Sequence, residues 1–311
     1  MTVLLGLAAV FAVINGVNDG GAMLAATLKV PGLRIIVSLA MFTVALAVVP
    51  LLIGTGVADT LTSGLVQADA DARPRLIAVG VVAAVTVVAA LTRSGLPTSL
   101  TLAMVGGIVG AGVGRGLPVA VAGVGRVLAI GAAAPVVGGM LALVFARGVA
   151  WALAVTRGDR LAVLHRVATA IQAVAYAAND GQKMLAVVAV TSLGVTLPTL
   201  VTVAGLFAIG AVIGVGAAAE TLGGQILRAG PREELTAQFA ASVAVLASAA
   251  LGAPVSMTQA VTGGLVGTGM LRGLRQVRWR VAQQLVLAWI VTLPSAALVG
   301  TGIAWFMGRM A

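Results

Sequence analysis

Two Asn-Asp pairs stand out in a chain that is otherwise almost wholly apolar: Asn18-Asp19 and Asn179-Asp180. The second pair lies in the stretch AYAANDGQKML, residues 175–185. Carboxylate and amide oxygens form an all-oxygen ligand set that suits a hard cation such as Na⁺, and a carboxylate can alternatively carry a proton. The two pairs therefore predict a site for a coupling ion, Na⁺ or H⁺, with a Na⁺ site at Asp19 and Asp180. The alternative is an interhelical hydrogen bond or a helix end at the membrane interface.

Two further polar residues follow the second pair, and they have no counterpart in the first. Gln182 and Lys183 stand where the first half of the chain has Gly21 and Ala22, so the predicted site is not symmetric. The Lys183 ammonium could balance Asp180 or help to neutralise a bound anion; alternatively it could extend toward the membrane surface. We assign Gln182, Lys183 and the asparagines Asn18 and Asn179 to substrate binding.

A second pair of motifs offers different chemistry, because each combines proline with hydroxyl side chains. The pattern G-x-P-x-S-x-T occurs twice, with its prolines at Pro97 and Pro254. Proline breaks or starts a helix, so the hydroxyls are expected in a first helical turn beside free backbone N–H groups. Hydroxyls and N–H groups together make a neutral cradle for an oxyanion. The predicted anion-binding residues are Ser99, Thr101, Ser256 and Thr258. The alternative is an ordinary N-cap serine on a packed helix.

The composition places these motifs in a membrane. Hydrophobic residues make up 60% of the 311 residues and charged residues only 9%, and the mean hydropathy is +1.13. Uncharged runs such as 35–58 and 281–308 are long enough to cross a hydrocarbon core of ~30 Å as a helix. A carboxylate at that depth costs ~2.5–3.5 kcal/mol on insertion scales and is usually functional. The chain is therefore expected to be an all-α polytopic membrane protein with about 10–12 membrane segments.

Charge and rare residue types narrow the function classes. The net charge of +10 arises from arginines in short hydrophilic segments, such as Arg272 and Arg275, which is typical of cytoplasmic loops rather than of nucleic-acid binding. The chain has no Cys, and its one His, His165, lies in the charged stretch TRGDRLAVLHR. Thiol chemistry, a zinc site and a membrane-embedded histidine relay are therefore not expected.

An internal repeat organises the chain. Ten of 18 positions are identical between residues 95–112 and 252–269, an offset of 157, and the Asn-Asp pairs repeat at an offset of 161. We predict a first transmembrane repeat over 1–150, a charged connecting segment over 151–166 and a second repeat over 167–311. Glycines beside the carboxylates favour broken helices, and the proline motifs favour re-entrant hairpins. Repeats that meet near the bilayer centre are a common transporter plan, and an odd number of crossings in each half would make them inverted.

Taken together, the paired Asn-Asp motifs and the paired G-x-P-x-S-x-T motifs resemble the inorganic phosphate transporter family, which also contains sulfate permeases. The resemblance covers nearly the whole chain. It implies secondary transport of an oxyanion with Na⁺ or H⁺, by an inverted-repeat fold that often forms homodimers. It also places Asn18, Asp19, Asn179 and Asp180 at the family's ion and substrate positions. The Ser/Thr residues of both motifs match its substrate positions, and Gln182 and Lys183 match an NDxQK variant.

Two departures from the family pattern bear on coupling. A third polar residue, Asn, often follows the first Asp by three positions, where this chain has Ala22; a His often follows the Ser-x-Thr, where it has Leu102 and Gln259. Fewer oxygen ligands in the first half leave H⁺ coupling, or coupling to fewer Na⁺ ions, open.

The prediction is a multi-pass symporter of inorganic phosphate in the plasma membrane. It needs no cofactor and is not an enzyme. Phosphate can donate a hydrogen bond to a carboxylate and sulfate cannot, which favours phosphate. A sulfate permease on the same scaffold is the first alternative. A passive anion channel is the second, although a channel needs a continuous polar path.

Overall fold

The protein is built from helices. The computed structural model describes residues 2–28, 34–93, 98–154, 160–191, 194–221 and 229–310, and within them the only β-type pairing is an isolated bridge between Val66 and Val119. Seven helices in this part of the chain are long and apolar enough to cross a membrane. Their outer faces are apolar, as Leu298 on α13 and Val121 on α7 illustrate. This composition of the outer surface fits contact with lipid rather than with water.

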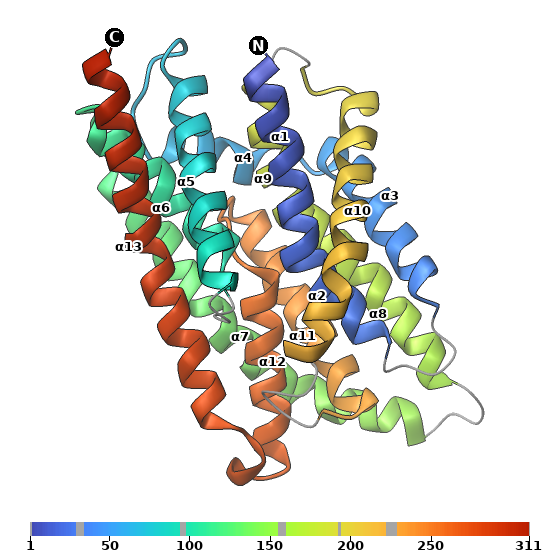
Figure 1. Ribbon diagram of the computed structural model, residues 1–311. Helices are drawn as coiled ribbons and strands as arrows, with labels where there is room; N and C mark the ends of the chain where they lie inside the picture. The colour runs from blue at the N-terminus through green and yellow to red at the C-terminus, as the bar shows by residue number, and fades with distance from the viewer. Residues whose placement is uncertain are drawn as a thin grey trace.

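The described residues of the first half form nine helical elements, of which α7 is the last. Figure 1 shows their arrangement. The first eight are α1 (Thr2–Asn15), the π-helical turn η1 (Gly16–Gly20), α2 (Gly21–Thr27), α3 (Ile35–Leu52), α4 (Gly56–Asp59), the π-helical turn η2 (Thr60–Gly64), α5 (Arg73–Arg93) and α6 (Leu100–Gly114). The long helix α7 (Val121–Ala154) closes this half.

The second half follows the same order. It comprises α8 (Arg160–Tyr176), the π-helical turn η3 (Ala177–Gly181), α9 (Gln182–Ala189), α10 (Leu197–Thr221), α11 (Pro231–Ala250), α12 (Met257–Leu271), the 3₁₀ turn η4 (Leu274–Gln276) and α13 (Trp279–Met310). The predicted connecting segment, 151–166, falls on the end of α7 and the start of α8, with 155–159 outside the described residues. The predicted domain boundaries stay predictions.

The helices that follow the two proline motifs, α6 and α12, are each too short to cross a bilayer. α6 and α12 have 15 residues each, which corresponds to ~22 Å against a hydrocarbon core of ~30 Å. α6 packs against α5, and α12 packs against α11, so each pair forms a helical hairpin. The short second arm of each hairpin fits a re-entrant segment, but α5 is long and apolar enough to cross a membrane, so re-entry stays a prediction. The described residues contain seven helices of spanning length, below the predicted 10–12 segments.

The two halves exchange their closing helices. α6 packs against α13 from the second half, and α12 packs against α7 from the first (Figure 1). α10 likewise lies along α1 and η1, whereas α3 lies along α8 and η3. Figure 1 shows α1 and α8 starting from opposite edges of the bundle, while α1 starts at the edge where α13 ends. This arrangement favours an inverted repeat, which stays a prediction.

Glycine makes these exchanged contacts close. In α6 the glycines Gly106, Gly110 and Gly114 face the backbone of α13, with carbonyls of Leu293 and Ala297 directly at the place where a Cβ would stand. In α12, Gly263 and Gly267 face the α7 backbone in the same way. Close backbone approach at small residues is the typical mode of helix packing in membranes. The hairpins are therefore held in place by the opposite half of the chain.

Candidate functional site

Both Asn-Asp pairs lie in π-helical turns. Asp19 is in η1 and Asp180 is in η3, at matching places in the two halves. The sequence predicts a break beside these glycines, whereas the backbone at Gly20 and Gly181 stays in the right-handed helical region and continues into α2 and α9. The helices are thus distorted at the motifs but not unwound. Single π-turns inside α-helices are often found at functional sites.

Packing explains the glycines better than a helix break does. A Cβ on Gly20 would come within 2.7 Å of Ala211 and Phe207 on α10, and one on Gly181 would come within 2.9 Å of the Pro50 ring on α3. Contacts below 3 Å do not occur for real side chains, so these positions accept only glycine without a shift of the neighbouring helix. The glycines therefore hold each π-turn against the helix that packs on it.

Two carboxylates and one ammonium are buried in or next to the two matching π-turns. Asp19, Asp180 and Lys183 are at most 2% exposed. The Lys183 ammonium donates to the Asp180 carboxylate at 2.6 Å. Asn18 donates to Asp19 at 2.9 Å. Ionisable groups buried at membrane depth are costly unless they are paired or functional, which marks this cluster as the candidate site.

The Lys183 ammonium also joins the two hairpins. It donates to the Thr101 hydroxyl at the start of α6, at 2.6 Å, and to the Val255 carbonyl just before α12, at 2.5 Å. Thr101 in turn donates to the same Val255 carbonyl at 3.1 Å. Lys183 thus occupies the meeting point of both hairpin ends and η3. The sequence leaves two roles open for Lys183, the balance of Asp180 and the neutralisation of a bound anion. The structure shows the ion pair with Asp180, and neutralisation of an anion stays a prediction.

Two of the predicted substrate ligands are fully engaged with the protein. The amide of Asn179 donates to the Ala253 carbonyl at 2.9 Å and accepts from the Val255 N–H at 3.0 Å, which fixes the segment before α12. The Gln182 oxygen accepts from the Val57 N–H at 2.8 Å at the start of α4. These side chains position the site in this conformation, and their contact with substrate stays a prediction.

The predicted serines stand at helix starts. Ser99 is the N-cap of α6 and accepts from the Leu102 N–H at 3.3 Å, while Ser256 is the N-cap of α12 and accepts from the Gln259 N–H at 3.4 Å. Ser256 also shares a 2.8 Å hydrogen bond with Thr258. The capping alternative is therefore present in both copies, and it leaves the hydroxyls beside the first N–H groups of each helix. Pro97 lies outside the described residues.

One link between the halves was not predicted from the sequence. The Tyr176 hydroxyl donates to the Asn15 side-chain oxygen at 3.0 Å, and these residues occupy equivalent positions in the repeat. Tyr176 is fully buried between the rings of Phe42 and Phe207. The repeat offset of 161 that pairs the aspartates also pairs these two residues, so the alignment of the halves contained the signal.

The expectation for His165 is wrong. It was placed in a hydrophilic connecting segment, yet it lies inside α8, is 1% exposed and falls within a helix long enough to span the membrane. Its ring nitrogens are 3.3 Å from the Gln238 oxygen and 2.8 Å from the Pro231 carbonyl. Flanking charges made the stretch resemble a loop, whereas the helical period turns His165 to the buried face and Arg166 to the exposed one.

Comparison with known proteins agrees with this architecture. The sequence profile described as "Phosphate transporter family" matches residues 15–160 and 154–300. A probable low-affinity inorganic phosphate transporter of Rhizobium meliloti (strain 1021) is 28% identical, over 95% of this chain and 93% of its own length. A protein of the same description from Mycobacterium bovis is 30% identical, over 94% of this chain and 75% of its own.

A solved structure supports the fold independently. The sodium-dependent phosphate transporter superposes with a TM-score of 0.79 over the full length of both chains, at 19% sequence identity. Together with the seven apolar helices, these likenesses identify a multi-pass membrane protein that is a transporter rather than an enzyme. The family profile covers both halves of the chain and both pairs of motifs, so the chain belongs to the phosphate transporter family.

Proposed function

We propose that the protein is a symporter that carries inorganic phosphate across the plasma membrane together with Na⁺ or H⁺. The observation that carries the proposal is the buried Asp180–Lys183 ion pair at the starts of α6 and α12, together with the buried Asp19 at the equivalent place in η1. The names of the relatives support phosphate as the substrate. Hydroxyls and free N–H groups at the two helix starts suit an oxyanion, since helix N-termini favour negative charge.

The charge of the cluster gives a physical reason for coupling. With both carboxylates ionised, Asp19, Asp180 and Lys183 carry one net negative charge, which repels a phosphate anion. Lys183 already neutralises Asp180 as an internal cation. The coupling ion is therefore expected at Asp19, where a Na⁺ or a proton removes the remaining charge and lets the anion bind. The absence of oxygen ligands at Ala22 favours one ion here over a set of several.

The first experiment is uptake of labelled phosphate into proteoliposomes. Na⁺ and pH gradients are imposed separately, with excess sulfate as a competitor. Uptake that saturates, follows one gradient and ignores sulfate establishes a phosphate symporter and identifies its coupling ion. Sulfate uptake without phosphate uptake would move the substrate to sulfate on the same scaffold. Flux that does not saturate and ignores both gradients would identify a channel.

The anion cradle has its own test. Changing Ser256→Ala together with Thr258→Ala removes two hydroxyls at the start of α12, each of which can donate a hydrogen bond to a charged oxyanion worth ~1.5–3 kcal/mol. We expect the KM for phosphate to rise by about tenfold or more, since ~1.4 kcal/mol corresponds to a factor of ten.

The stability of this variant must be measured as a control, because Ser256 also caps α12. The melting temperature of the purified variant shows the loss of the cap separately from the loss of substrate binding. A folded variant with the parental KM would show that the hydroxyls do not contact phosphate.

A further inference from the structure

A line of polar side chains follows one face of α8 toward the site. His165, Thr169, Gln172 and Tyr176 recur at intervals of three or four residues and are at most 2% exposed. This spacing places them on one face of a helix. The next member of the series is Asp180 in η3. The line therefore connects the start of α8 with the charged cluster over a distance of roughly 22 Å, at 1.5 Å per residue.

α11 supplies the other side of this line. The Gln238 amide donates to the Gln172 oxygen at 3.1 Å, and the His165 ring lies 3.3 Å from the Gln238 oxygen. The second ring nitrogen of His165 is 2.8 Å from the Pro231 carbonyl at the first residue of α11. We call this interface of His165, Thr169, Gln172 and Gln238 the polar seam. Two glutamines and one histidine thus hold α8 and α11 together.

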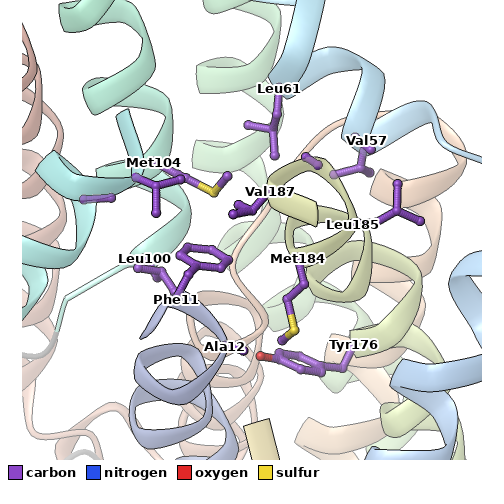
Figure 2. Close-up of a cluster of buried hydrophobic side chains, with 14 of the residues drawn as sticks. Phe11, Ala12, Val57, Leu61, Leu100, Met104, Tyr176, Met184, Leu185 and Val187 are labelled. Carbon is purple, nitrogen blue, oxygen red and sulfur yellow. The ribbon is translucent and has the colours of Figure 1, made fainter. Parts of the chain in front are cut away.

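The equivalent interface in the first half is apolar. With the repeat offsets of 161 and 157, Thr169, Gln172 and Gln238 correspond to Ala8, Phe11 and Val81. These three residues are buried, and Phe11 and Val81 belong to the main hydrophobic cluster. Figure 2 shows Phe11 and Ala12 of α1 among the apolar side chains of Leu100, Met104, Met184 and Val187. Duplicated helices thus differ in polarity at matching places.

Hydrogen bonds between α8 and α11 do not satisfy every buried polar atom along the seam. The hydroxyl of Thr169, the side-chain nitrogen of Asn15 and one carboxylate oxygen of Asp180 are buried and have no hydrogen-bond partner among the described residues. Each such group costs ~1–3 kcal/mol when it stays unpaired in a protein interior. All three lie along the seam or at its inner end. Groups of this kind suit an interface that polar species enter during the working cycle.

Arginines outnumber acidic residues around the outer end of the seam, where the first turn of α11 also carries Glu233 and the buried Glu234. α11 starts with Pro231 and the exposed Arg232, and Glu233 forms a 3.2 Å ion pair with Arg272 at the end of α12. The turn η4 after α12 adds the exposed Arg275, and the first turn of α13 adds the exposed Arg280. Basic segments at membrane-span ends mark the cytoplasmic face. A cluster of cations at a pore mouth also raises the local concentration of anions.

We propose that the polar seam is the passage through which the anion moves between the Asp180–Lys183 site and the face with the basic segments. The passage is closed in this structure by the Gln172–Gln238 hydrogen bond and opens when the hairpin of α11 and α12 separates from α8. The apolar interface of α1 and α5 forms the opposite barrier. The proposal rests on the proposed transport function, because it assigns a route to the same substrate.

The absence of native cysteine makes a direct test practicable. In the double variant Gln172→Cys/Gln238→Cys, a short bifunctional methanethiosulfonate reagent links the two helices, and dithiothreitol releases them. A spanning reagent is needed because the glutamines meet only through their side-chain ends, whereas a disulfide requires Cβ atoms ~3.5–4.5 Å apart. We expect phosphate uptake to fall at least tenfold on linkage and to return on reduction.

Each cysteine variant is compared with itself before and after reduction, and the two single variants receive the same reagent. One-ended modification adds bulk to the passage but cannot hold the helices together, so the loss of uptake in the single variants should be clearly smaller than in the linked double variant. Linked protein that transports phosphate at its reduced rate would overturn the proposal. Cysteines that never react while phosphate uptake proceeds would also overturn it, because the seam then stays closed.

A second readout is independent of uptake. In Thr169→Cys, a membrane-impermeant charged thiol reagent should react when it is added to the face with the basic segments. The reaction should be faster while the protein is transporting inorganic phosphate and the coupling ion. The matched control is Ala8→Cys at the equivalent apolar position, which should not react from that face. Reaction of Thr169→Cys only from the opposite face would contradict the passage. If Thr169→Cys reacts as expected but no variant or parent transports phosphate, the proposed substrate is wrong and the passage stands.

Discussion

Replacement of Asp180 by asparagine is expected to lower gradient-driven phosphate uptake by about a hundredfold or more. Asn cannot carry the negative charge that Lys183 contacts at 2.6 Å, so the ammonium would stay buried beside the Thr101 hydroxyl and the Val255 carbonyl without a counter-ion. Removing one partner of a buried ion pair costs ~3–5 kcal/mol, and ~1.4 kcal/mol corresponds to a factor of ten. Proteoliposome uptake under the coupling gradient measures the effect.

The control for this experiment is Asp71→Asn. It makes the same chemical change at an exposed residue before α5, and it should transport phosphate as the parent does. Both proteins are quantified in the membrane before uptake is compared, because misfolding of Asp180→Asn would also stop transport. Normal uptake by a well-folded Asp180→Asn protein would remove this carboxylate from the mechanism.

The substitutions Gly110→Val and Gly267→Val are each expected to destabilise the fold by on the order of 3 kcal/mol or more. These glycines are equivalent in the repeat, and each touches the closing helix of the opposite half. A Cβ at Gly110 would overlap the Ala297 backbone of α13, and one at Gly267 would overlap the Gly139 backbone of α7. Backbone atoms cannot rotate away, so the two helices would have to separate. Thermal unfolding of the purified protein in detergent measures the loss.

Gly125→Val serves as the matched control. It lies in α7, and a Cβ there would meet nothing within 4 Å. Valine changes the intrinsic helix preference in the same way at both places, so a difference between the variants reports the close contact alone. Equal melting temperatures for Gly110→Val and Gly125→Val would show that α6 and α13 do not pack this closely in the membrane.

The sequence predicted most of the architecture because membrane proteins impose strong patterns. The lengths of the apolar runs predicted the membrane helices. The repeat offset predicted that Asp19 and Asp180 are equivalent, and both lie in π-turns. The phosphate transporter family was predicted from the same motifs and is confirmed. The sites for ion and substrate stay predictions, although the structure brings Asp180, Lys183 and Thr101 together.

Other features depend on contacts that no local pattern contains. The glycine beside each carboxylate suggested a helix break, yet its role is set by α10 or α3, elements distant in the chain. Gln182 carries an amide suited to a substrate, yet its oxygen caps α4 through the Val57 N–H. His165 was assigned by its charged neighbours rather than by its helical face. In each case the partner lies on another element, and a single sequence does not specify which elements meet.

The exchange of closing helices also has a consequence for biosynthesis. The glycine face of α6 is covered by α13, whose last residues are made nearly 200 positions later. At a synthesis rate of ~5–20 residues per second, that face waits roughly 10–40 s before its partner emerges. During this interval the first hairpin lacks the contacts that hold it, so the insertion machinery or a chaperone must protect it. The first half of the chain is thus completed by a helix that is synthesised after α8 to α12 of the second half.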